Sequence, residues 1–260
     1  MKRKNLFTSQ VINSVTKFDS YKEVCNHSIT SSFVYIFILI LLYSIATTIG
    51  VVHKTKVSFE NARNFVQAEI QDFSYEDGVL NVNNGEFKMI RYNDIIIHTS
   101  DDAKLEEYGG RIVFGKTDFY INSGDTKAKF SYKNFLDGKM DKNTLLEILD
   151  VGKLMPLMIC VAFVVTFIVL TISTLLDVLI IALIGLMITV FNGNNKVKFK
   201  NAFNLSVHAI TLSILLGMIY IVVNAYTGFN VKYFSTMYTL IAAIYMITAV
   251  ILVNTDQNAK

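Results

Sequence analysis

The sequence predicts a mainly α-helical integral membrane protein with four or five spans and one inserted α+β domain that contains a small antiparallel sheet. Residues 28–52 run without a charge, and this run exceeds the roughly 20 apolar residues that a helix needs to cross a bilayer. Residues 154–195 carry one charge, Asp177, and further apolar runs follow at 202–225 and 233–253. The stretch 53–153, between the first two runs, is polar. Apolar residues make up 52% of the chain and its mean hydropathy is +0.43, which is high for a soluble protein.

The N-terminal segment 1–27 is basic and amphipathic. Phe7, Val11, Val15 and Phe18 recur at helical spacing, which predicts a helix that lies on the membrane surface. A partly disordered basic tail remains the alternative. The segment carries five basic and two acidic residues. Its basic residues are Lys2, Arg3, Lys4, Lys17 and Lys22. By the positive-inside rule, this side of the membrane is the cytoplasm.

The apolar run 28–52 predicts the first transmembrane helix. Its apolar core is longer than that of a cleavable signal peptide, and no small-residue cleavage site follows it, so we expect it to remain as an anchor. With the N-terminus in the cytoplasm, the domain at 53–153 lies outside. That domain carries 14 basic and 17 acidic residues and has no basic stripe of the kind that binds nucleic acid.

The pattern within 53–153 predicts a small antiparallel sheet of five to seven strands flanked by a helix at each end. Apolar spacing at 56–70 predicts a short helix that leaves the membrane. Residues 78–82 and 86–92 flank Asn83-Asn84-Gly85, a turn signal, and predict a hairpin. Further strands are expected at 94–99, 111–115, 118–121 and 127–132. Helical spacing returns at 141–151.

Residues 154–195 admit two interpretations. Hydropathy gives two spans, 154–176 and 178–193, hinged near residues 173–177. The lysines at 196, 198 and 200 would then face outside, although the positive-inside rule favours the cytoplasmic side for them. A single crossing by a long bent or partly re-entrant helix places them inside. The last two spans, 202–225 and 233–253, then return the polar tail 254–260 to the cytoplasm. The sequence leaves both alternatives open.

Several motifs, in a fixed order, resemble a bacterial membrane family of unknown function. These motifs are DFSYEDGVLNVNNGEF, IIIHTSDD, RIVFGKTDFYI, KFSYKNFLDGKMDKNTLLEIL and KFKNAFNLSVHAITLSILLG. The family occurs mainly in Gram-positive bacteria, and some members are labelled as maltodextrin-utilisation proteins. Here His98 stands where the family usually has aspartate, and Ser213 where it has proline. The second half is also loosely similar to Yip-type membrane domains, which are not enzymes. The resemblance implies an architecture with the N-terminus inside, one extracytoplasmic domain and a helix bundle.

Two residues are candidates for an intramembrane polar site. Asp177 is the only acid in the apolar half, and a charge in the bilayer is a functional hypothesis by default because its insertion costs a few kcal/mol. His208 is its only plausible basic partner for a proton or cation relay. A position at a solvated turn or interface explains Asp177 more simply than a relay does. Transporters usually show several such polar groups within repeats, and no repeat is visible here.

The remaining residues do not predict catalysis, a metal site or a cofactor. His98 with Asp101 and Asp102 lacks the three or four converging ligands of a metal site. The two cysteines, Cys25 and Cys160, are expected to be reduced and without a redox role. The domain is rich in aromatic residues, which suits a groove that stacks on a sugar or peptide. A core and an exposed strand edge explain the same residues.

The sequence therefore predicts a non-enzymatic multi-pass protein of a bacterial plasma membrane. Its extracytoplasmic domain would contact a ligand or partner, and its helices would contact the lipid bilayer and each other or a second membrane protein. The alternative is an accessory component of a solute transport system, for maltodextrin or other oligosaccharides, and it depends only on the family labels. A membrane enzyme is disfavoured because no paired carboxylates or His/Asp cluster stand at a membrane face.

Overall fold

The chain forms two compact units in a computed structural model that describes residues 6–83, 89–99, 111–123, 126–134, 138–152, 154–191 and 197–258. The first unit consists of Met1–Lys54 and Pro156–Lys260, and the second of Thr55–Met155. Each unit has a hydrophobic core of its own.

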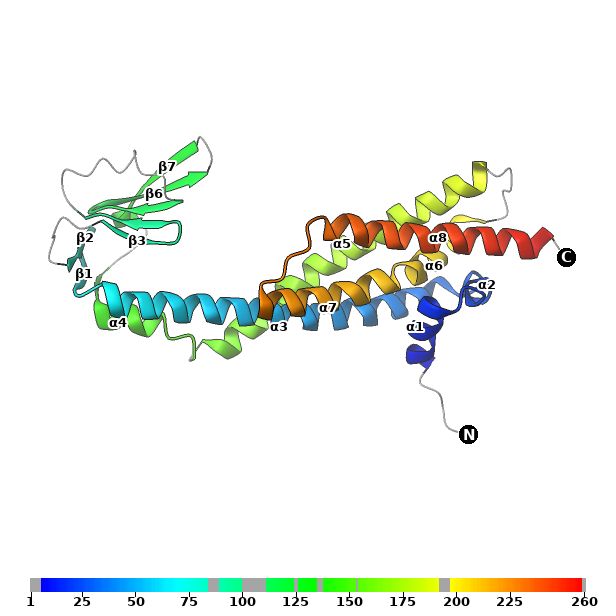
Figure 1. The fold of residues 1–260 in the computed structure, drawn as a ribbon, viewed down its shortest axis with the longest axis horizontal. Helices are drawn as coiled ribbons and strands as arrows, with labels where there is room; N and C mark the ends of the chain where they lie inside the picture. Colours follow the sequence, from blue (N-terminus) through cyan, green and yellow to red (C-terminus); the bar gives the residue numbers. More distant parts are fainter. Residues whose placement is uncertain are drawn as a thin grey trace. The chain divides into compact units, whose positions relative to one another are not determined.

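Four stretches of helix in the described residues are long and apolar enough to cross a membrane. They are α3 (Ile29–Glu69), α5 (Met155–Phe191), α6 with α7 (Phe199–Ala209 and Thr211–Thr227) and α8 (Phe234–Asn258) (Figure 1). One whole side of α5 exposes large apolar side chains, among them Val161, Val165 and Val169. Soluble proteins rarely leave such a surface open to water. These features confirm the mainly helical class and the four candidate spans.

Helix α5 runs without a break through residues 173–177, so the described residues contain one candidate span over 155–191 rather than two separate segments at 154–176 and 178–193. The physical reason is that this stretch, Ser-Thr-Leu-Leu-Asp, holds no glycine or proline to end a helix. Helix α3 shows the same behaviour. The first span expected at 28–52 and the short helix expected at 56–70 are one continuous helix.

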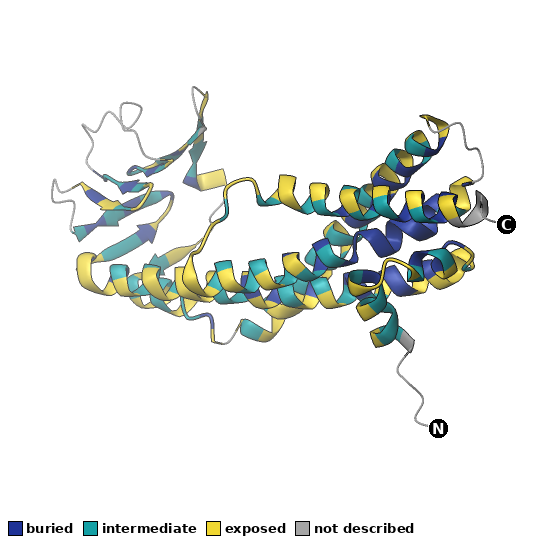
Figure 2. Cartoon of the chain, turned by 45° about the vertical axis from the view of Figure 1, so that its right-hand side comes forward, coloured by how far each residue is buried: buried dark blue, intermediate teal, exposed yellow. Residues whose placement is uncertain are grey.

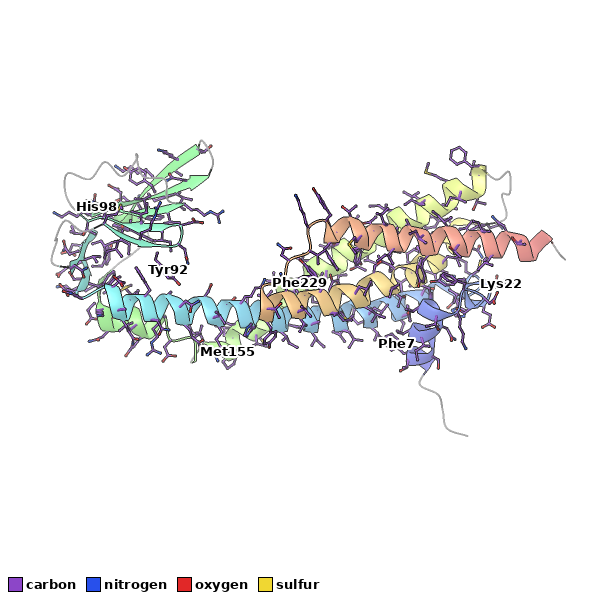
Figure 3. All side chains as sticks on the ribbon, in the orientation of Figure 1. Phe7, Lys22, Tyr92, His98, Met155 and Phe229 are labelled. Carbon is purple, nitrogen blue, oxygen red and sulfur yellow. The ribbon has the colours of Figure 1, made fainter. Side chains whose placement is uncertain are left out.

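Two short helices replace the single amphipathic helix expected at the N-terminus: α1 (Leu6–Thr16) and α2 (Ser20–Val24). The apolar stripe that was expected to face lipid packs on protein instead. The ring of Phe7, labelled in Figure 3, lies 5.5 Å from that of Tyr35, and the ring of Phe18 lies 5.0 Å from that of Tyr245. Tyr21 is fully buried. The basic residues Lys2, Arg3 and Lys4 lie outside the described ranges.

The core of the first unit centres on α6, where every residue from 202 to 209 is buried (Figure 2). Small residues let the surrounding helices approach closely, as is usual between membrane helices. A Cβ added at Gly50 of α3 would lie 3.1 Å from Cγ2 of Ile221 on α7, and one at Gly185 of α5 would collide with the side chain of Met246 on α8.

The second unit contains two sheets and the short helix α4 (Lys142–Ile148). The three-stranded sheet has the order β2-β1-β8 and consists of β1 (Phe73–Glu76), β2 (Val79–Val82) and β8 (Lys139–Asp141). The five-stranded sheet follows the order β3-β4-β5-β6-β7 and consists of β3 (Ile90–Tyr92), β4 (Ile95–Ile97), β5 (Ile112–Phe114), β6 (Asp118–Ser123) and β7 (Thr126–Ser131). Because β4 and β5 pair in parallel, the sheet is mixed rather than antiparallel.

One predicted hairpin is wrong and another is confirmed. Strand β2 pairs with β1 through the turn at Asp77-Gly78, whereas β3, the described part of 86–92 that forms a strand, belongs to the other sheet. The side chain of Asn83 explains the end of β2, because its Oδ1 accepts from the Gln71 amide at 2.8 Å and ties this position back to the end of α3. Asn84, Gly85, Asp101 and Asp102 lie outside the described residues. The hairpin expected at 111–115 and 118–121 is the β5–β6 pair.

Candidate functional site

An apolar cavity of about 340 Å³ lies inside the second unit, between the end of α3, both sheets and α4. The side chains that line it are all aliphatic, aromatic or thioether groups. They belong to Ala62, Phe65, Val66, Ile70, Phe73, Tyr75, Leu80, Val82, Tyr92, Ile95, Ile97, Phe114, Tyr132, Met140, Leu145 and Leu149. No charged residue stands among them.

Each wall of this cavity follows from a local feature of the sequence. Helix α3 presents Ala62, Phe65 and Val66 at helical spacing, and β2 presents Leu80 and Val82 at the alternate positions of a strand. The ring of Phe65 lies 4.5 Å from that of Tyr92 on β3, which is labelled in Figure 3. These contacts close the cavity on the side of α3.

Helix α4 forms another wall and is held by its N-cap. The side chain of Asp141 accepts from the Thr144 amide at 2.7 Å and from the Thr144 hydroxyl at 2.7 Å. The backbone N–H of Thr144 lowers the pKa of the Asp141 carboxyl, so the cap is charged at neutral pH. This cap fixes the start of the helix that carries Leu145 and Leu149 into the cavity wall.

One polar group at the wall of this cavity, the hydroxyl of Tyr132, is already hydrogen-bonded. The Tyr132 hydroxyl donates to the Gly115 carbonyl at 2.9 Å. Burial raises the pKa of the Tyr132 phenol far above its usual range, so it stays protonated. Among the described lining residues, the groups that could exchange a proton are tyrosine hydroxyls, and the rest of the lining is apolar. The cavity can therefore hold an apolar molecule.

Asp177 and His208, the two residues predicted from the sequence, occupy different surroundings in the first unit. Asp177 is half-buried and lines a cavity of about 290 Å³ between α3, α5 and α8, with Tyr43 and Tyr238 among its neighbours. His208 is buried on α6 and its Nδ1 lies 2.7 Å from the Ser14 hydroxyl oxygen of α1. Within the described ranges, no hydrogen bond or ion pair joins Asp177 to His208.

His208 belongs to a buried polar cluster that joins α1, α3, α6 and the start of α7. The ring of Tyr35 stacks on that of His208 with centroids 4.3 Å apart, and the Tyr35 hydroxyl lies 3.0 Å from the hydroxyl oxygen of Thr211. One helical turn before His208, Asn204 receives a hydrogen bond from Ser32 at 2.8 Å. The side-chain amide of Asn204 donates to the backbone carbonyl of His27 at 2.8 Å. These bonds satisfy buried polar groups and hold the N-terminal segment on the bundle.

The other residues singled out from the sequence have structural surroundings. The His53 ring stacks on Tyr226 with centroids 4.0 Å apart, and the His98 amide donates to the Phe114 carbonyl at 2.8 Å. Cys25 and Cys160 are both free thiols, and burial raises the pKa of Cys25. The part of the chain that the structure describes contains no group of three or more His, Cys, Asp or Glu side chains that could hold a metal.

Sequence reasoning missed the tyrosines that line the Asp177 cavity and the serine that contacts His208. Tyr43 and Tyr238 sit within apolar runs and gave no signal beyond their hydroxyls. Ser14 falls one turn after Val11 in the apolar stripe of α1, and a polar residue at a core position was the available sign of a buried partner.

A family model described as "Protein of unknown function (DUF1189)" matches residues 8–250 of the chain. Neither the comparison with curated proteins nor the comparison with solved structures found a match. The match confirms the family expected from the order of the sequence motifs. The maltodextrin-utilisation label and the likeness to Yip-type domains stay predictions.

Proposed function

The chain belongs to the DUF1189 family, and we propose that it is a non-enzymatic multi-pass protein of a bacterial plasma membrane whose second unit binds the acyl chain of a lipid-like ligand. The single observation that carries this proposal is the cavity of about 340 Å³ bounded by Ala62, Leu80 and Tyr132. Its volume falls in the range of about 300–1,000 Å³ that is typical of small-molecule sites.

The chemistry of the lining selects the ligand. An apolar cavity of roughly 150 Å³ can stay dry and take up a small hydrocarbon, and this cavity is larger. Each buried CH₂ group of an acyl chain contributes about 0.8 kcal/mol on transfer out of water. A flexible chain can follow the irregular space between α3, α4 and the sheets.

The same lining argues against the alternative role in oligosaccharide uptake. A sugar presents hydroxyls in every direction, and each one that is buried without a partner costs about 1–3 kcal/mol. Of the polar side-chain groups that this cavity offers, which are all tyrosine hydroxyls, that of Tyr132 is already bonded to Gly115. The mostly aliphatic and aromatic character of the described lining likewise supports a binding role.

The orientation we propose places the N-terminus in the cytoplasm and the second unit outside. The N-terminal segment and the start of α6 lie together at one end of the bundle. The side-chain amide of Asn201 on α6 donates to the backbone carbonyl of Cys25 in the N-terminal segment at 2.9 Å. Lys17, Lys22, Lys198 and Lys200 therefore stand at the same end. A shared basic end is what the positive-inside rule expects of the cytoplasmic face.

The test is photocrosslinking of the full chain in nanodiscs with a palmitic acid analogue that carries a diazirine. We expect adducts on the peptides that contain Leu80 and Val82. Substituting Ala62→Phe fills the cavity from α3 and should abolish these adducts. Ala68→Phe is the matched control, because Ala68 is exposed on the same helix, and it should label like the parent.

Two results would refute the proposal. One is a parent protein whose adducts fall only on the candidate spans. The other is an Ala62→Phe variant that labels these peptides as strongly as Ala68→Phe does, since a filled cavity cannot hold the probe.

A further inference from the structure

A second cavity, of about 290 Å³, lies among the apolar helices of the first unit and is lined mostly by polar side chains. Helix α3 contributes Tyr43, while α5 and α8 contribute the rest. The full lining is Tyr43, Leu170, Ser173, Thr174, Asp177, Phe234, Ser235, Tyr238 and Thr239. This composition is unusual in helices long and apolar enough to cross a membrane, where each polar group carries an insertion cost.

Asp177 is the one charged residue of this lining. No lysine, arginine or histidine stands among the lining residues, and within the described ranges Asp177 makes no ion pair. A carboxylate in an apolar setting costs several kcal/mol unless a cation accompanies it. The described lining provides an acidic group and space beside it, and a cation from outside the chain would balance the charge of that group.

The other lining residues indicate which class of cation would fit this cavity. Tyr43, Phe234 and Tyr238 contribute aromatic rings, which attract alkylated ammonium groups in particular. Calcium or magnesium would require about six or more oxygen ligands at close range, and the described lining offers one carboxylate, with only neutral hydroxyl groups besides it. Its volume also exceeds what a bare metal ion fills.

We infer that the Asp177 cavity binds an alkylammonium group, with the Asp177 carboxylate as its counter-ion and the aromatic rings of Tyr43 and Tyr238 beside it. A smaller cavity of about 80 Å³ shares Asp177, Tyr238 and Thr239 and extends to Ile181 and Ile210. It gives an alkyl substituent room beyond the charged group. The ammonium group can belong to a soluble amine or to a lipid headgroup. This inference does not depend on the acyl-chain site of the second unit.

The experiment measures binding to the full chain in nanodiscs of phosphatidylglycerol. Tetramethylammonium and ethylammonium chlorides are titrated calorimetrically against sodium chloride of equal ionic strength. A parallel set of nanodiscs includes phosphatidylethanolamine, and protection of the protein against thermal unfolding is measured. We expect saturable binding in the first arm for a soluble amine, or stabilisation in the second arm for a lipid headgroup.

Two substitutions connect that signal to the cavity. Asp177→Asn keeps the shape and removes the charge, and it should weaken binding at least tenfold, whereas the exposed Asp94→Asn should not. Ser173→Phe fills the cavity and leaves Asp177 in place, so it should also abolish binding. Ile172→Phe is its control, because Ile172 is exposed on the same helix and does not line the cavity.

The inference fails if neither arm shows an effect in the parent protein, or if the effect survives Asp177→Asn. It also fails if sodium or potassium ions bind in an Asp177-dependent way while both ammonium probes do not, since the site would then belong to a metal ion.

Discussion

Ser14 and His208 show how a single hydroxyl can secure a terminal segment. Ser14 is buried on α1, and its hydroxyl lies 2.7 Å from Nδ1 of His208 on α6 while also donating to the Gln10 carbonyl at 2.7 Å. The Tyr21 hydroxyl donates to the Ser14 carbonyl at 2.8 Å, so the same residue connects α1 to α2. Polar contacts of this kind fix one arrangement of helices where apolar packing alone would allow several.

We predict that Ser14→Ala destabilises the first unit by about 1–3 kcal/mol, because it leaves Nδ1 of the buried His208 without a partner. The measurement is hydrogen exchange of the full chain in detergent, where the α1 amides should lose protection. Thr16→Ala removes an exposed hydroxyl from the same helix and should leave exchange unchanged. Equal protection in both variants would contradict the role of the Ser14–His208 contact.

Residue-level signals decided which strand pairs were found. Asp77-Gly78 is a strong hairpin signal, since both residues take positive φ, at 51° and 83°. The sequence also carries Asn83-Asn84-Gly85, and this turn signal predicts the wrong partner for β2. With Asp77-Gly78 as the turn, β1 would have been found as the partner of β2. Strand β8, at residues 139–141, is too short to show a period of two.

At the scale of elements, the cap of α4 gives a pH-dependent prediction. The pKa of Asp141 is lowered in the folded chain, so its contribution to stability is present above the unfolded pKa of about 3.9 and disappears as the pH falls through the folded pKa. Asp141→Ala should therefore increase hydrogen exchange of the α4 amides at pH 7, and the difference from the parent should shrink below about pH 4.

The exposed Asp72→Ala in the same unit is the matched control and should not change α4 at any pH. Asp141→Asn keeps an acceptor for the Thr144 amide, so its effect at pH 7 should be smaller than that of Asp141→Ala. A pH-independent difference between Asp141→Ala and the parent would show that the charge of the carboxylate is unimportant.

Long helices were predictable from hydropathy, whereas their ends and contacts were not. The apolar runs at 202–225 and 233–253 fall within α6–α7 and α8. Hydropathy could not show that α3 continues to Glu69, because the last turns of this helix are polar and lie outside the apolar run at 28–52. Nor could it reveal the Asp177 cavity, whose walls come from three helices that are far apart in the sequence. The sequence did single out Asp177, while His208 proved to contact Ser14 instead.

At the scale of the whole molecule, the proposed orientation can be tested with a membrane-impermeant thiol reagent on intact cells. Single cysteines at Thr8, Asn84 and Lys198 are introduced after Cys25 and Cys160 are replaced by serine. We expect labelling at position 84 and protection at positions 8 and 198, because one continuous α5 carries the chain back across the membrane. Labelling at positions 8 and 198 with protection at position 84 would show that the orientation is inverted. Labelling at position 198 with protection at position 8 would place these two positions on opposite sides and contradict the shared basic end.

The continuous helix α5 also has a consequence for the lipid around the protein. Its 37 residues extend about 55 Å at 1.5 Å per residue, whereas the hydrocarbon core is about 30 Å thick. Tilting alone would require an angle beyond the usual maximum of about 40°. If α5 crosses a bilayer, its surplus apolar turns would thicken the membrane locally or be covered by protein outside it. A mismatch of this size would favour thicker membrane regions and make the energy of the protein depend on lipid chain length.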